Sequence, residues 1–225
     1  MNPSTTQSDF PIDAVLDRIR EAVAPFPPAV MFELADLGYS TLFQQIIACV
    51  VSIRTREEVT RPVCLRLFAE ASGPATFIAM SDVEIGRLIR PSTFHEQKAR
   101  QIREIARIAA DREGTDLECS RDEVLALPGV GPKCANLALG IACGLPLIAV
   151  DIHVHRVVNR WGYVRANSPE RTMNALGDVL PERRRVEINR LLVPFGKNIC
   201  TGIRPKCSTC PVRPQCRQVG VTGCR

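Results

Sequence analysis

Apolar side chains recur along this chain at intervals of three and four residues, which is the spacing of one face of an α-helix. In a helix of residues 12–23, one face would carry Ile12, Val15, Ile19 and Val23. The same spacing recurs further along, in residues 40–52, 59–68, 102–109 and 186–195. Because the alternation typical of a half-buried strand never persists, the pattern predicts an all-α protein.

Proline and glycine separate these helical segments. Residues 128–132, Pro-Gly-Val-Gly-Pro, predict a tight turn between two helices. Residues 145–150 are the only strand-like stretch, but the proline within it and the aspartate after it favour an extended linker. Three prolines near the end predict that the last 25 residues form a loop.

The composition is that of a folded globular protein, because 45% of the 225 residues are hydrophobic and 24% are charged. No run reaches the ~18 apolar residues that span a bilayer, and the opening MNPSTTQSDF has no basic start or apolar run that would indicate a secretory signal. We expect residues 1–10 to be a disordered tail and the protein to be intracellular, in the cytoplasm or nucleoid if the source is a bacterium. Thiols stay reduced there, so the ten cysteines need a purpose other than disulfides.

Positive charge gathers at one end of the chain. Residues 181–225 hold ten Lys and Arg but only two acidic residues, a net charge of +8, whereas the whole chain carries +5. A basic segment on a near-neutral body indicates a polyanionic partner, such as nucleic acid or an anionic membrane surface. A tail that merely aids solubility is the alternative.

Four cysteines near the C-terminus have the spacing of metal ligands. They follow the pattern C-x6-C-x2-C-x5-C, formed by Cys200, Cys207, Cys210 and Cys216. Four thiolates on a short loop can surround one metal centre. Zinc is the competitor, but structural zinc sites usually pair two close knuckles and only one C-x2-C is present. The spacing therefore favours an iron–sulfur cluster.

The remaining cysteines suggest no second metal site. Cys49 and Cys64 lie in apolar helical segments, where a buried inert thiol is expected. Cys134 could be a catalytic thiol, but no histidine partner is near it in the sequence. Cys224 is too far beyond Cys216 to fit the pattern, and we expect it to be exposed.

The tight turn leads directly to a lysine. Gly129 and Gly131 permit positive φ angles and leave backbone N–H groups bare, and Pro132 suits the first position of a helix. A helix N-terminus with bare amides binds phosphate. Lys133 then lies on the first helical turn, where the helix dipole favours a neutral amine that can attack a carbonyl-like carbon. A surface lysine that binds phosphate is the alternative.

Asp151 follows the extended linker and precedes the helical segment IHVHRVVNRW. The simple interpretation is an N-cap for that helix. The other is a carboxylate in a cleft, which would stabilise positive charge on a sugar or activate water. The residues alone leave both open.

Taken together, three motifs resemble the endonuclease III family of helix-hairpin-helix DNA glycosylases with an iron–sulfur cluster. They are LPGVGPKCAN at residues 127–136, AVDIHVHRVVNR at residues 149–160, and the four-cysteine pattern. The resemblance extends from about residue 40 to residue 216. It implies that Lys133 is the Schiff-base lysine and Asp151 the catalytic aspartate. It also implies that the four cysteines hold a [4Fe–4S] cluster and that the DNA backbone is contacted by Gly129, Val130, Gly131, Arg204 and Lys206.

The resemblance also implies a fold and a partner. The family has two α-helical lobes, here a six-helix lobe of residues 36–146 and a cluster lobe of residues 11–35 with 147–225, ending in the iron–sulfur cluster loop. The expected partner is double-stranded DNA containing oxidised pyrimidines or abasic sites, bound by a monomer without a membrane partner.

The implied activity is that of a bifunctional DNA glycosylase and abasic-site lyase. The damaged base must be rotated out of the duplex to be reached, and relatives that only activate water lack a lysine at position 133. At Arg54 the family usually has a glutamine that fills the gap left by the flipped nucleotide, so substrate range can differ here. A damage-binding protein without catalysis is the alternative. A mismatch adenine glycosylase is disfavoured by Lys133 and by the short segment after the cysteines.

Overall fold

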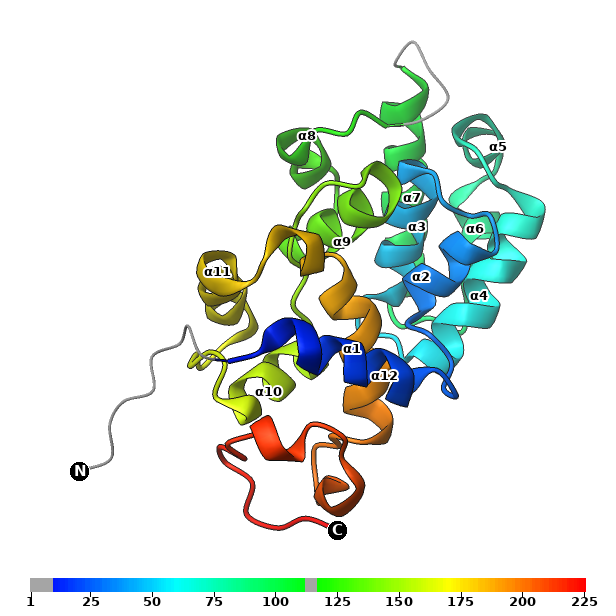
Figure 1. Ribbon diagram of the computed structural model, residues 1–225. Coiled ribbons are helices and arrows are strands. Elements are labelled where there is room, and N and C mark those ends of the chain that lie inside the picture. The colour runs from blue at the N-terminus through cyan, green and yellow to red at the C-terminus, as the bar shows by residue number, and fades with distance from the viewer. Residues whose placement is uncertain (1–9, 112–116) are drawn as a thin grey trace. The chain divides into compact units, whose positions relative to one another are not determined.

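The computed structural model describes residues 10–111 and 117–225, and every regular element in those ranges is helical (Figure 1). This confirms the all-α prediction. The chain divides into two compact units, one of residues 30–145 and the other of residues 1–29 with 146–225. Within the described ranges no helix is both long and apolar enough to cross a bilayer.

The unit of residues 30–145 is built around α3 (Leu42–Ser52), which packs against α2, α4, α7 and α9. Every α3 side chain except that of Ser52 is buried, which explains the wide apolar stripe in its sequence. A capping box closes the N-terminus of α3. Thr41 Oγ1 accepts a hydrogen bond from Gln44 N at 3.2 Å, and Gln44 Oε1 accepts one from Thr41 N at 3.3 Å. The other helices of this unit are α2 (Val30–Asp36), α4 (Glu57–Glu70), α5 (Pro74–Ala79), α6 (Asp82–Leu88), α7 (His95–Ala110), α8 (Arg121–Ala126) and α9 (Pro132–Cys143).

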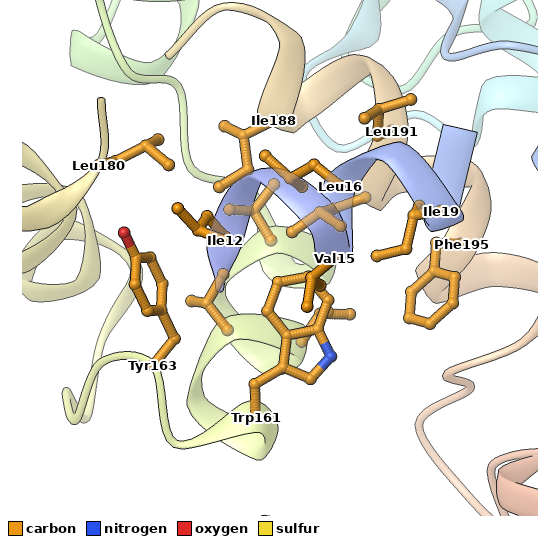
Figure 2. Packing of buried hydrophobic residues seen from close by; sticks show 14 of the residues in the cluster. Ile12, Val15, Leu16, Ile19, Trp161, Tyr163, Leu180, Ile188, Leu191 and Phe195 are labelled. Atoms are coloured by element: carbon orange, nitrogen blue, oxygen red, sulfur yellow. The ribbon is translucent and has the colours of Figure 1, made fainter. Parts of the chain in front are cut away.

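In the other unit, α1 (Ile12–Val23), α10 (Ile152–Trp161) and α12 (Glu187–Asn198) enclose an apolar core (Figure 2). The apolar face predicted for residues 12–23 is buried in this core, where Trp161 is 1% exposed and Phe195 is fully buried. The remaining elements are α11 (Pro169–Val179) and the 3-10 turns η2 (Glu182–Arg184), η3 (Cys207–Thr209) and η4 (Arg213–Gln215). As predicted, residues 145–150 form an extended linker without strand pairing.

The ends of the two units differ from the expected boundaries. Of the expected tail, residues 1–9 lie outside the described residues, whereas Phe10 stacks on Trp161 with 5.9 Å between ring centroids. The expected lobe of residues 36–146 instead begins at Val30, because α2 buries its apolar side chains and packs against α3, α4 and α9. The described part of this unit holds eight helices, α2 to α9.

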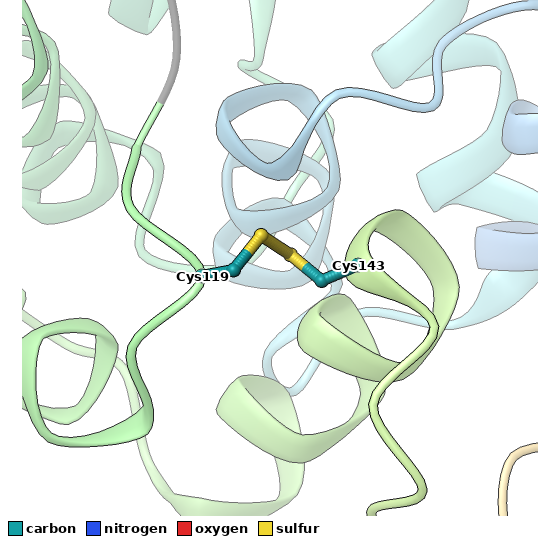
Figure 3. Close-up of a disulfide and its surroundings, with 2 residues drawn as sticks. All are labelled: Cys119 and Cys143. Atoms are coloured by element: carbon teal, nitrogen blue, oxygen red, sulfur yellow. A yellow bond between two sulfur atoms is a disulfide. The ribbon is translucent and has the colours of Figure 1, made fainter.

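A disulfide joins Cys119 to Cys143, which corrects the expectation that every cysteine serves another purpose (Figure 3). Cys119 precedes α8 and Cys143 ends α9, and these two helices pack against each other. Packing brings the two Cα atoms to 6.1 Å, within the range that a disulfide bridges. The bond therefore closes a loop that contains α8, the turn and α9. The other eight cysteines are not in disulfides.

Part of the basic C-terminal segment is neutralised within its own unit. Arg184, whose side chain is 13% exposed, forms ion pairs with Asp13, Asp17 and Glu187 at 2.7, 2.9 and 2.8 Å. Arg183 also pairs with Asp13, at 2.6 Å. These contacts hold the start of α12 against α1. Arg183 and Arg184 therefore stabilise the fold through ion pairs within their own unit.

Candidate functional site

The turn at residues 127–131 joins α8 to α9 and is shaped by one glycine. Gly129 has φ = +79°, a left-handed conformation that favours glycine, and Val130 N donates to Leu127 O at 3.2 Å. A Cβ at Gly129 would also lie 2.5 Å from the Gln101 side chain. Gly131 has φ = −100° and is the N-cap residue of α9.

Lys133 is the second residue of α9, as predicted, and is half-buried. Pro132 occupies the first helical position, where no N–H is needed for the helix. The lysine therefore lies at the positive end of α9, immediately after the turn.

The neighbouring Cys134 is buried and is one of a thiol pair. The Cys49 side chain donates a hydrogen bond to Cys134, which lowers the pKa of Cys134, and the Lys133 charge lowers it further. The same contact, together with burial, raises the pKa of Cys49. Cys49 Sγ also lies 3.9 Å from Cys134 O, which links α3 to α9. With Cys134 only 6% exposed, the structure favours a packing role over a catalytic one.

Arg54 lies in the loop between α3 and α4, in a left-handed conformation with φ = +53°. Its side chain is exposed, with Cζ 5.9 Å from the centroid of the Phe94 ring. Thr93 Oγ1 donates to Arg54 O at 2.9 Å. Phe94, which was not predicted from the sequence as a site residue, has φ = +57° and is 55% exposed. An exposed aromatic ring beside a guanidinium is suited to stacking on a base.

Lys98, which was also not predicted from the sequence as a site residue, supports the loop that carries Arg54. It is 3% exposed, and its Nζ donates to Val51 O at 2.8 Å, Ile53 O at 2.7 Å and Thr55 Oγ1 at 3.0 Å. Burial lowers its pKa to about 8. A signal was present in the sequence, because Lys98 occupies the apolar face of α7 four residues before Ile102.

Asp151, in the other unit, is the N-cap of α10. Its Oδ1 accepts from His153 N at 2.9 Å and from Val154 N at 2.8 Å. The capping interpretation is thus confirmed. The side chain is half-buried, and both of these hydrogen bonds go to Oδ1. Lys133 and Asp151 belong to different units of the chain.

The four cysteines of the C-terminal pattern line one cavity. Its empty volume, including the part open to solvent, is about 370 Å³. Cys207 is buried, and Cys200, Cys210 and Cys216 are half-buried. The walls between them are mostly apolar and include Trp161, Phe195, Ile199 and Val221. The loop therefore brings all four thiols to one space.

Two arginines on α10 hold the start of this loop. Arg160 donates to Cys200 Sγ at 3.5 Å and to the carbonyl oxygens of Thr201 and Gly202 at 2.6 and 2.7 Å. Arg156 donates to Cys200 O at 3.2 Å and to Gly196 O at 2.8 Å. Neither arginine was predicted from the sequence, although their spacing of four places them on one helix face.

The end of the loop is fastened to the C-terminus of α10. Arg217 N donates to Trp161 O at 3.2 Å, and Val219 N donates to Arg160 O at 3.0 Å. The close approach of Arg217 to the end of α10 favours a glycine at position 162. Gly162 has φ = +73°, and a Cβ there would lie 2.5 Å from Arg217 Cδ.

Arg204 and Lys206 lie between the first two cysteines. Arg204 is exposed and has φ = +47°, whereas Lys206 is half-buried and its N donates to Ile199 O at 3.0 Å. Between Cys200 and Arg204 the loop also exposes Ile203, at 87%. This surface presents positive charge, which suits contact with phosphate.

The thiols are spread around the cavity. Among the described residues, no three His, Cys, Asp or Glu side chains converge closely enough to ligate one metal ion. Four thiols that line one cavity are a donor set that suits a metal–thiolate centre. Burial raises the pKa of Cys207 to about 11, and also raises the pKa values of Cys210 and Cys216. Binding of a metal centre would therefore displace protons from these thiols.

Comparisons with known proteins agree on one family. Residues 47–182 match the model of the HhH-GPD superfamily base excision DNA repair protein. The chain is 38% identical over 174 residues to Endonuclease III of Thermotoga maritima. This alignment covers 77% of this chain and 82% of that protein. Two solved structures, a non-covalent Endonuclease III–DNA complex and a trapped Endonuclease III–DNA covalent intermediate, resemble it with TM-scores of 0.77 and 0.76. Each of these two structures is 28% identical in sequence to this chain, and each match covers 95% of this chain and 96% of the solved chain.

Proposed function

Because the chain belongs to the endonuclease III family and is a DNA glycosylase of base excision repair, we propose that it also acts as an abasic-site lyase, with Lys133 as the nucleophile. Its proposed substrates are duplexes that contain oxidised pyrimidines or abasic sites, and its proposed product is a strand cut on the 3′ side of the damaged position. A solved relative trapped as a covalent DNA intermediate supports a covalent route.

The placement of Lys133 on the first turn of α9, directly after the Gly129 turn, carries this proposal. The Lys133 amine would attack C1′ of the extruded nucleotide, forming the N–C1′ bond as the base leaves with the electrons of its glycosidic bond. Opening of the sugar ring would give an imine with Lys133. The imine would acidify the C2′ proton, and loss of that proton would expel the 3′-phosphate.

Asp151 is proposed to act on the same sugar. A carboxylate can stabilise positive charge that develops at C1′ as the base departs, or remove a proton from the attacking amine. The two hydrogen bonds from α10 amides to Oδ1 fix its carboxylate at the helix N-terminus.

DNA contacts are proposed for both units. The turn at Gly129, Val130 and Gly131 would lie against a backbone phosphate. Arg54, beside the exposed ring of Phe94, would fill the space left by the extruded nucleotide. Arg204 and Lys206 would bind backbone phosphates in a manner that does not depend on sequence.

The four cysteines are proposed to hold a [4Fe–4S] cluster. The shared cavity and the free thiols of Cys200, Cys207, Cys210 and Cys216 support a metal–thiolate centre, and their spacing, with a single C-x2-C pair, favours a cluster over zinc. When bound, the cluster would cross-link the loop that carries Arg204 and Lys206. The purified protein should then be brown with a broad band near ~400 nm, where d¹⁰ zinc thiolates are silent. A colourless protein containing stoichiometric zinc would reject the cluster.

Borohydride reduction of the protein with an abasic duplex tests the lyase. The parent should form a covalent adduct, because reduction fixes the imine, whereas Lys133→Ala should form none. Lys197→Ala is the matched control, since Lys197 is exposed near the end of α12. Equal trapping by Lys133→Ala would refute the assignment. Tight binding of abasic DNA without an adduct or cleavage by the parent would favour a damage-binding protein.

A further inference from the structure

Gly196 lies in the last turn of α12, where its backbone conformation does not require glycine. It is buried, and its φ angle is not positive. Glycine destabilises a helix relative to alanine, so its presence here has another reason. That reason is a close approach, because a Cβ at this position would lie 2.8 Å from His153 Nδ1 and 2.9 Å from His153 Cβ. The first turn of α10 therefore packs directly on the backbone of α12.

Arg156 holds the His153 ring in this position. Its Nη2 lies 3.1 Å from His153 Nδ1 and donates to Gly196 O at 2.8 Å, and its Nε donates to Cys200 O at 3.2 Å. A guanidinium can only donate, so His153 Nδ1 is the acceptor. The imidazole is thus fixed by packing on Gly196 of α12 and by a hydrogen bond from Arg156, one turn further along α10.

His153 is also bonded to Asp151. His153 N donates to Asp151 Oδ1 at 2.9 Å, and Val154 N donates to the same oxygen at 2.8 Å. Both amides belong to the first turn of α10, which the His153 ring holds against α12. We propose that His153 is a positioning residue that sets the place of the Asp151 carboxylate. This proposal rests on the role proposed above for Asp151.

Loss of the ring should affect the chemical step rather than the binding of DNA. Without the ring, the start of α10 loses both its packing on Gly196 and its hydrogen bond from Arg156, so the carboxylate moves with the helix end. A displacement of about 1 Å can slow a reaction by ~100-fold. The phosphate contacts that determine DNA affinity are proposed for other residues.

The test measures release of thymine glycol from a duplex in a single turnover, with the full chain in excess, and the dissociation constant in parallel. His153→Ala should slow release about tenfold or more and leave the dissociation constant unchanged. His153→Asn should restore most of the rate, because its amide oxygen can accept from Arg156 in place of Nδ1. Gly196→Ala should slow release as His153→Ala does, since the new methyl group displaces the ring. Gly177→Ala, on α11, is the matched control and should keep the parent rate, because a Cβ there meets nothing within 4 Å.

A double-mutant cycle separates positioning of Asp151 from a general structural role. Asp151→Asn is the reference, because the amide oxygen of asparagine can still cap α10. In that background His153→Ala should slow release no further, since its effect passes through the carboxylate.

Several results would overturn the role of His153. They are the same slowing by His153→Ala in both backgrounds, a parent rate in His153→Ala, and a loss of DNA affinity in place of rate. Insolubility of both His153→Ala and Gly196→Ala would assign the ring to the fold and would overturn it as well. If Asp151→Asn released the base as fast as the parent, the role proposed for Asp151 itself would be refuted.

Discussion

Replacing Lys98 with methionine tests whether this buried amine holds the Arg54 loop. Methionine keeps much of the aliphatic length but removes three hydrogen bonds, to Val51 O, Ile53 O and Thr55 Oγ1. Hydrogen bonds from a charged donor each contribute about 1.5–3 kcal/mol. Methionine also avoids the burial of an ammonium group, which offsets part of that sum. We expect the free energy of unfolding to fall by about 3 kcal/mol at neutral pH.

The pH dependence of this loss gives the sharper test. Burial lowers the pKa of Lys98 from 10.5 to about 8, so the unfolded chain binds more protons than the folded protein between those values. The stability contributed by Lys98 therefore rises with pH across that range. At 1.36 kcal/mol per pKa unit, the gap between the parent and Lys98→Met should widen by about 3 kcal/mol. The neighbouring Cys64 thiol, whose pKa burial raises to about 12, stays protonated throughout.

Urea unfolding of both proteins, followed by circular dichroism from neutral pH to about pH 10, measures this gap. The variant should also bind abasic DNA more weakly, because the loop that carries Arg54 loses its support. A gap that stays constant or narrows as the pH rises would refute the assignment of a lowered pKa to Lys98. A variant as stable as the parent at neutral pH would refute the structural role of its hydrogen bonds.

Predictions for four other substitutions follow from the same structure. Gly129→Ala forces a side chain into φ = +79° against Gln101 and should destabilise the protein by about 1–2 kcal/mol, seen as a lower melting temperature; an unchanged value would contradict the turn geometry. Cys143→Ser opens a loop with a sequence separation of 24 and should cost about 3 kcal/mol, and adding a reductant should lower the melting temperature of the parent but not of the variant. Arg204→Ala and Lys206→Ala should each weaken DNA binding alike for all sequences and reduce the slope of affinity against salt by about 1, whereas a sequence-dependent loss would argue against phosphate contacts.

The features that the sequence predicted are those encoded locally. Apolar spacing located α1, α3 and α12, and the turn before α9 was predicted from its glycines and prolines. The spacing of the cysteines indicated a shared site, and the structure places all four around one cavity. In each case a short segment carries the whole signal.

The features that the sequence did not predict depend on packing between distant segments. The Cys119–Cys143 bond forms because α8 packs on α9, and an argument from the redox compartment cannot detect that proximity. Lys98 and Arg160 act on carbonyl groups 40 or more residues away in the chain. The net charge of residues 181–225 overstated the charge available to DNA, because Arg184 is held by Asp13 and Asp17 from α1.

The central claim is that Lys133 is the nucleophile, and the composition of the chain makes it directly testable. The chain has four lysines: Lys98, Lys133, Lys197 and Lys206. Borohydride-trapped protein should be digested, and the peptide that carries the deoxyribose remnant identified by mass spectrometry. The account predicts the remnant on Lys133 alone. A remnant on Lys206, on another lysine or on the N-terminal amine would contradict it.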